Sequence, residues 1–161
     1  MNLQQLMSLL PQQVPFRFVD QIICYQPGEW LEAVFLPERL HDSLGSQSFF
    51  PDTCLMEGLA QATVIFTQLE TEPLRPGELP LLGSIETELV RPVAWDEQLT
   101  YQIRPIRMMQ RRAILEGAVY GRVGQSEPGD LAAKAIIGVV ISSSEMLQQE
   151  VRSGEAGDPC E

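Results

Sequence analysis

The sequence is poor in the residues that build metal, redox and disulfide sites. It has one histidine, His41, and three cysteines, Cys24, Cys54 and Cys160, which are widely spaced and form no C-x-x-C pair. A single histidine excludes a multi-histidine metal site, and we expect neither a metal nor another cofactor. The odd number of scattered cysteines favours reduced thiols and a cytoplasmic location.

Positive charge and long apolar runs are also scarce. Eleven lysines and arginines stand against 22 aspartates and glutamates, which gives a net charge of −11. This charge repels nucleic-acid phosphates and anionic membrane surfaces, so neither is an expected partner. No run reaches the roughly 18 apolar residues of a membrane span. Residues 1–13 have no basic region, so we expect no signal peptide.

What remains is an ordinary globular composition, with 44% hydrophobic and 20% charged residues in 161. We expect a single domain over residues 1–142. The acidic segment 143–161 has little to bury, and we expect it to be disordered.

The apolar spacing predicts an α+β pattern. Leucines at helical spacing predict a short helix over 2–10, and Pro51 with Asp52 as N-cap predicts a long helix from 52 to about 69. Segments 37–50 and 71–83 are expected to be loops. Strands are predicted at 16–25, 29–36, 84–93, 97–107, 113–123 and 131–142.

The long helix carries one unexpected charge. In FFPDTCLMEGLAQATVIF (49–66) the helix is apolar nearly all round, yet Glu57 lies in its middle and Gln61 shares its polar face. The stretch holds no lysine or arginine, and a buried carboxylate without a partner costs several kcal/mol. Glu57 is therefore the first candidate for a functional residue.

Three segments resemble 3-hydroxyacyl-acyl carrier protein dehydratases of the FabZ and FabA type. LLPQQVPFRFVDQI (9–22) is similar to LLPHRYPFLLVDRI, and FPDTCLMEGLAQAT (50–63) is similar to MPGVLIVEALAQ. GSIETELVRPVAWDEQL (83–99) resembles GIDGVRFRRPVVPGDQL. The resemblance covers roughly residues 3–142, and the helix motif is its most specific part.

This resemblance implies a hotdog fold, in which a curved antiparallel sheet wraps a long helix. It further implies a homodimer or higher homo-oligomer, a tunnel for the acyl chain, and a substrate carried on acyl carrier protein or coenzyme A. Glu57 matches the family's catalytic acid, which protonates the leaving hydroxyl. The positions implied to bind substrate are Ser43, Pro51, Asp52 and Gln61.

The family's catalytic histidine is missing. Ungapped alignment places Ser43 at that position, and no HFPG motif occurs. The related aryl-polyene dehydratases use a histidine in their LPH opening, where this chain has Gln12. His41 lies two residues from Ser43, which makes it a candidate base by proximity in sequence.

Three functions stay open on this basis. The first is a hydro-lyase that dehydrates 3-hydroxyacyl thioesters in fatty-acid or polyketide-type synthesis, impaired by the lost histidine. The second is a non-catalytic acyl-binding subunit, paired in a heterodimer with an intact homologue. The third is a hotdog thioesterase, in which a helix carboxylate activates water.

Arginine is concentrated in one part of the chain. Six of the eleven basic residues fall between positions 91 and 122. A solvated strand face would explain this, but an acidic carrier protein would also bind there. The arginines expected to dock a carrier are Arg104, Arg107, Arg111 and Arg112.

Overall fold

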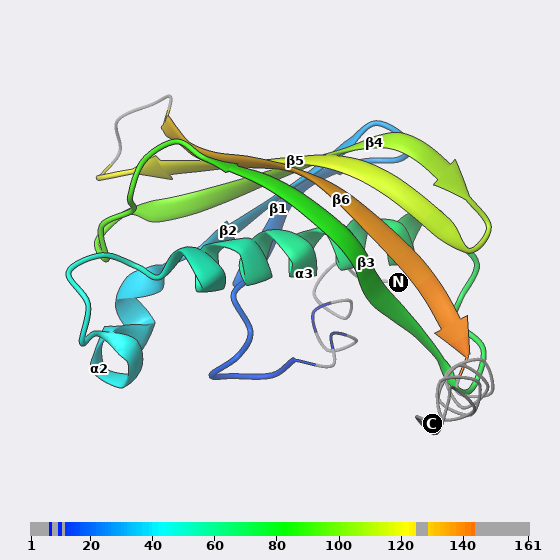
Figure 1. Cartoon of the computed structure of the whole chain (residues 1–161), viewed down its shortest axis with the longest axis horizontal. Helices are drawn as coiled ribbons and strands as arrows, with labels where there is room; N and C mark the ends of the chain where they lie inside the picture. The colour runs from blue at the N-terminus through cyan, green and yellow to red at the C-terminus, as the bar shows by residue number, and fades with distance from the viewer. Residues whose placement is uncertain (1–6, 8–9, 11, 125–128, 144–161) are drawn as a thin grey trace, which may run out of the picture.

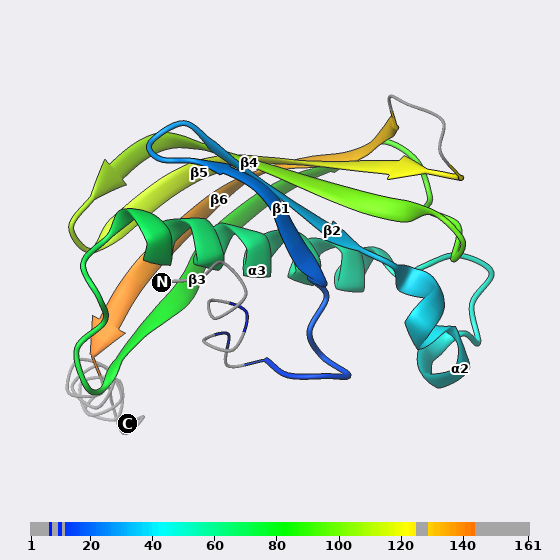
Figure 2. The same cartoon turned by 180° about the vertical axis from the view of Figure 1, so that it is seen from behind.

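The central element is helix α3 (Asp52–Glu70), which lies along a curved antiparallel sheet (Figures 1 and 2). The structure is a computed structural model that describes residues 7, 10, 12–124 and 129–143. The predicted long helix and the α+β pattern are confirmed. The expected helix over 2–10 lies largely outside the described residues, and so does the tail from 144.

Six strands form one sheet in the order β1-β2-β4-β5-β6-β3, with every neighbouring pair antiparallel. The strands are β1 (Gln21–Gln26), β2 (Trp30–Phe35), β3 (Glu78–Leu89), β4 (Gln98–Met109), β5 (Arg112–Arg122) and β6 (Asp130–Ser143). This arrangement is a hotdog fold.

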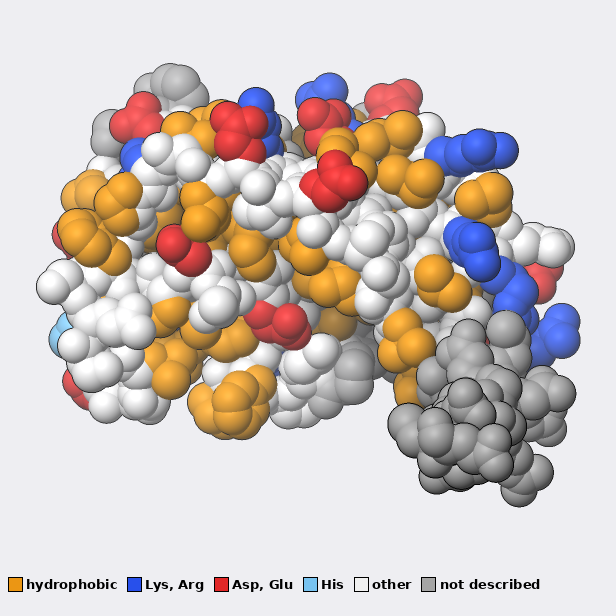
Figure 3. All heavy atoms as spheres, viewed as in Figure 1, with side chains coloured by type: hydrophobic (Ala, Val, Ile, Leu, Met, Phe, Trp, Pro, Cys, Tyr) orange, Lys and Arg blue, Asp and Glu red, His pale blue; other side chains and the backbone are white. Residues whose placement is uncertain are grey.

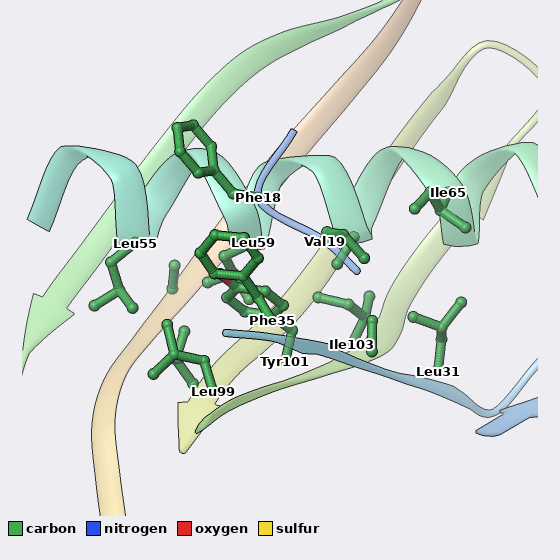
Figure 4. Close-up of a cluster of buried hydrophobic side chains, with 14 of the residues drawn as sticks. Phe18, Val19, Leu31, Phe35, Leu55, Leu59, Ile65, Leu99, Tyr101 and Ile103 are labelled. Atoms are coloured by element: carbon green, nitrogen blue, oxygen red, sulfur yellow. The ribbon is translucent and has the colours of Figure 1, made fainter. Parts of the chain in front are cut away.

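The concave side of the sheet and one face of α3 enclose the core (Figure 4). Fully burying one leucine or isoleucine side chain contributes about 1.5–3 kcal/mol, so this contact is the main source of stability. Gly117 on β5 lets the two layers approach, because a Cβ there would lie 2.9 Å from a Leu59 methyl carbon. Other buried members are Leu31, Leu55, Ile65, Leu99, Tyr101, Ile103 and Leu115.

The start of α3 differs from the prediction. Pro51, with an extended backbone, holds the cap position and Asp52 is the first helical residue. No side-chain cap bond forms, and the Pro51 carbonyl accepts the Leu55 N–H at 3.0 Å. Asp52 as N-cap was therefore wrong, because the proline already supplies the non-helical turn that an N-cap residue requires.

Several other predicted limits of helices, strands and loops were also wrong. Segment 37–50 is not all loop: it holds a 3-10 helix (Pro37–Leu40) and the short helix α2 (His41–Leu44). Proline at a first helical position and the buried Leu40 explain the first of these. The first strand begins at Gln21 rather than at 16.

The loop expected over 71–83 ends early, because β3 begins at Glu78. Pro80 made this stretch resemble a loop. It is tolerated because β3 is an edge strand, where a missing N–H interrupts no second ladder. Pairing with β6 therefore determined the outcome more than local composition did.

No helix in the described part of the chain is long and apolar enough to cross a membrane. The expected domain limits, 1–142 with a separate tail, stay a prediction because only the ranges given above are described.

Candidate functional site

A cavity of about 410 Å³ lies between the N-terminal half of α3 and edge strand β3. Figure 3 shows apolar side chains dispersed among acidic ones over this side of the molecule. The helix contributes Asp52, Thr53, Met56, Glu57 and Ala60, and the strand contributes Leu82, Ile85, Thr87 and Leu89. The walls are mainly apolar, and two carboxylates stand among them.

Glu57 has hydrogen-bond partners that the sequence did not reveal. Its Oε1 accepts from Gln12 Nε2 at 3.2 Å and from Gln61 Nε2 at 3.0 Å. The side chain is half-buried, and no ion pair to it is found in the described ranges. The expectation of an unpaired carboxylate was thus wrong: two neutral amides take the place of a cation.

Gln61 shares the polar face of α3 with Glu57 as predicted, and it is buried, with only 2% of it exposed. Its Nε2 also donates to the Phe16 carbonyl at 2.8 Å, and its Oε1 accepts the Phe18 N–H at 2.9 Å. Gln61 therefore fastens residues 12–18, which we call the strap, to α3. The strap runs below α3 in both views (Figures 1 and 2). With both N–H groups occupied, Gln61 serves the strap and Glu57 rather than a substrate.

The structure brings only some of the predicted site residues together. Asp52 and Glu57 line the cavity, whereas Pro51 precedes it at the helix start. His41 and Ser43 lie on exposed α2 and do not line the cavity. The His41 ring instead packs edge-on against Trp95, with ring centroids 5.0 Å apart.

Gln12 is the site residue that sequence reasoning missed. It lies 45 positions from Glu57, so no local periodicity connects them. The only available signal was that Gln12 occupies the opening-motif position where related dehydratases carry histidine. The structure gives this alignment a physical meaning, because it shows the side chain at that position in contact with Glu57.

The four arginines expected to dock a carrier are all exposed, but they differ in whether they are already paired. Arg111 pairs with Glu78 at 2.9 Å and donates to the Ile141 carbonyl. Arg104, Arg107 and Arg112 are exposed on the β4–β5 hairpin, and the structure gives them no ion pair with a described residue.

Comparison with known proteins agrees with this fold and motif pattern. No protein-family model matches the chain. The FabZ 3-hydroxyacyl-acyl carrier protein dehydratase of Pectobacterium atrosepticum is 29% identical over 119 residues, covering 71% of this chain and 78% of that protein. The FabZ of Proteus mirabilis is 28% identical over the same shares.

Solved structures show the same architecture at low sequence identity. A thioesterase from Haemophilus influenzae matches with a TM-score of 0.67 and 14% identity, over 89% of this chain and 92% of its own. A hot-dog-like protein from Thermanaerovibrio acidaminovorans matches at 0.58 and 15%, over 83% and 96%. The chain is a hotdog-fold protein. Within that fold its sequence is similar to the FabZ dehydratases.

Proposed function

We propose that the protein binds acyl thioesters in the cavity between α3 and β3 and dehydrates 3-hydroxyacyl thioesters through Glu57. One observation carries the proposal: an ionisable carboxylate stands in an apolar cavity without a charged partner among the described residues. The apolar walls suit an acyl chain, and the similarity to FabZ dehydratases supports the reaction class.

The chemistry must proceed without histidine, because none lines this cavity. The Glu57 carboxylate can take the α-proton and then deliver it to the 3-hydroxyl as the C–O bond breaks. The products are the enoyl thioester and water, and Glu57 is ionised again. Lacking a separate base costs about 10²- to 10⁴-fold in rate, so we expect a slow enzyme.

Thioester hydrolysis is a second candidate, and the hydrogen bonds of Glu57 suit it as well as they suit dehydration. The hydrogen bonds from Gln12 and Gln61 are both N–H donations to Oε1, an arrangement that suits an ionised, acceptor-only carboxylate. Such a group can take a proton from water as the water attacks the thioester carbonyl. A coenzyme A-bound thioesterase-like protein from Streptococcus pneumoniae shares the fold, with a TM-score of 0.59 and 10% identity over 76% of this chain and 85% of its own.

We further propose that the working unit is a homodimer. Leu82 and Leu89 line the cavity from β3 yet are 47% and 49% exposed, and β3 is an edge of the sheet. A second copy would cover this strand and narrow the cavity. Light scattering should give at least twice the 18.0 kDa chain mass. A monomer that gains mass only with a histidine-bearing homologue would indicate the heterodimer instead.

The acyl group is carried on acyl carrier protein or coenzyme A. Exposed Arg104, Arg107 and Arg112 suit an acidic carrier, whereas Arg111 is already bound to Glu78. Reversing Arg107 to glutamate should weaken carrier binding more than reversing Arg111, and both effects should shrink at high salt. We also propose a cytoplasmic location, which the widely spaced cysteines suit.

One experiment separates the candidates. The purified protein is incubated with a 3-hydroxyacyl thioester and with its enoyl counterpart, while enone absorbance and free thiol are followed together. A change in enone alone supports dehydration, and thiol release supports hydrolysis. Binding without either change would show a non-catalytic acyl-binding protein and overturn the proposal.

A further inference from the structure

We infer that Gln12 is a positioning residue that orients Glu57 for reaction, an inference that rests on the proposed function. Two carboxamides, from Gln12 and Gln61, donate to the same oxygen, Glu57 Oε1. Neither amide can give up a proton or take one near neutral pH. They therefore act on Glu57 by orientation, and they are not an acid or base of the reaction themselves.

The two amides belong to one assembly. Gln61 is fixed by the Phe16 carbonyl and the Phe18 N–H of the strap, and Gln12 reaches Glu57 from the other end of that strap. Holding the strap against α3 thus places both donors at once. Within the strap, the Gln12 side chain and the backbone of Phe16 and Phe18 position the Glu57 carboxylate. The Gln13 side chain bonds to the Leu10 carbonyl instead and takes no part in this assembly.

The hydrogen bonds to Glu57 Oε1 leave the second carboxylate oxygen, Oε2, available to a substrate. The structure gives Glu57 Oε2 no hydrogen bond to any described residue, and Glu57 lines the cavity. Because Oε1 is held by two donors, the plane of the carboxylate is constrained. Oε2 is consequently the atom that meets the substrate, and loss of the Gln12 bond would misalign it. Misalignment of a reacting group lowers kcat with little effect on substrate binding.

Gln12 offers a cleaner test than Gln61. Gln61 is 2% exposed and anchors the strap, so replacing it would also disturb the fold. Gln12 is half-buried, and its side chain donates to Glu57. The neighbouring Gln13 is exposed and donates to the Leu10 carbonyl at 2.8 Å, which makes it a matched control.

The experiment measures kcat and KM of Gln12→Ala, Gln12→His and Gln13→Ala. The reaction used is the one that the unchanged protein catalyses, dehydration or hydrolysis. Loss of one hydrogen bond to a charged group predicts an about 10-fold fall in kcat for Gln12→Ala, with KM changed less than about twofold. Gln12→His keeps an N–H donor and should retain kcat at or above the original. Gln13→Ala should leave both constants unchanged.

Side-chain amide NMR adds a readout that needs no turnover. The Gln12 amide resonances, assigned by their loss in Gln12→Ala, should shift when Glu57 is replaced by alanine. Equal kcat for Gln12→Ala and Gln13→Ala overturns the inference and leaves the proposed function standing. If the unchanged protein has no turnover, the proposed function fails. The contact between Gln12 and Glu57 is then tested by NMR alone. Gln12 amide resonances that do not shift in Glu57→Ala would overturn the inference.

Discussion

Two regions of the molecule hold a partly or fully buried carboxylate in opposite ways. At the β3–β4 connection, Glu97 is 6% exposed and accepts two hydrogen bonds from Arg91, at 2.9 and 2.7 Å, and one from the Ala94 N–H at 2.8 Å. Glu57 is half-buried, receives two neutral amides on one oxygen, and borders a cavity. The bonds of Glu97 hold the fold together, whereas Glu57 keeps one oxygen available.

The surroundings of Glu97 explain why this carboxylate has a structural role. Burial alone would raise the pKa of Glu97, but the hydrogen bonds from Arg91 and Ala94 and the charge of Arg91 lower it below its ordinary value. Arg91 also donates to the carbonyls of Gly121 and Asp130, which ties the β3–β4 connection to the end of β5 and the start of β6. A carboxylate bonded in this way stabilises the fold and has no capacity left for a substrate.

The largest expected effect is on turnover at the cavity. Glu57→Gln keeps the shape but can no longer exchange a proton, so kcat should fall about 10³-fold or more if one group acts as both base and acid. Circular dichroism should show an unchanged fold. Asp52→Asn, at the other carboxylate of the cavity, is the matched control and should change kcat less than about threefold. Equal losses in the two variants would contradict the distinct role of Glu57.

The next effect is on stability at the β3–β4 connection. Glu97→Gln leaves the Arg91 guanidinium without its anion, and breaking a buried ion pair typically costs about 3–5 kcal/mol. Because the Arg91 side chain is 29% exposed, we expect a smaller loss, about 2–3 kcal/mol, in urea unfolding at pH 7. Exposed Glu116→Gln should change the unfolding free energy by less than about 0.5 kcal/mol.

The same substitution should make stability less sensitive to acid. The folded-state pKa of Glu97 is lowered, so its stabilisation is fully present above the unfolded value of about 4.5 and disappears as pH falls through the folded value. The difference between Glu97→Gln and the unchanged protein should therefore be largest near pH 7 and shrink below pH ~4.5. A constant difference down to pH 2 would show that the carboxylate is not preferentially ionised by folding.

The contrast between the two carboxylates also shows what sequence can predict. Helix α3 was predictable because its signals, Pro51 and the run of apolar residues, lie within one segment. The contact of Gln12 with Glu57 was not, because it joins residues 45 positions apart and neither has a periodicity that implies the other. The expected loop before β3 failed for the same reason: Pro80 is a local signal, and the β6 ladder that overrides it is distant in sequence.

The shape of the cavity gives a fourth prediction. Ala60 is 7% exposed and lines the cavity from α3, three residues after Glu57. Ala60→Leu would fill part of that space, so acyl-chain affinity should fall about 10-fold, and more for longer chains. Isothermal titration with acyl thioesters of increasing length measures this. Affinities that fall equally for all lengths would place the acyl chain elsewhere.

The smallest expected effect tests whether every buried polar group without a partner signals function. Tyr101 is fully buried beneath α3, and its hydroxyl has no hydrogen-bond partner among the described residues. Burial also raises its pKa well above the ordinary value, so the group stays neutral. It fits only because Gly58 has no Cβ, which would overlap the hydroxyl.

Unlike Glu57, Tyr101 does not line the cavity, so its unpaired hydroxyl should only destabilise the fold. Tyr101→Phe should therefore raise the unfolding free energy by about 1 kcal/mol and leave turnover unchanged. Tyr120→Phe, on the half-exposed side of β5, should change neither. Lower stability in Tyr101→Phe would mean that the hydroxyl is hydrogen-bonded in solution. Lower turnover in Tyr101→Phe would mean that the functional site extends beneath α3. Lining the cavity would then not be the property that distinguishes functional polar groups from structural ones.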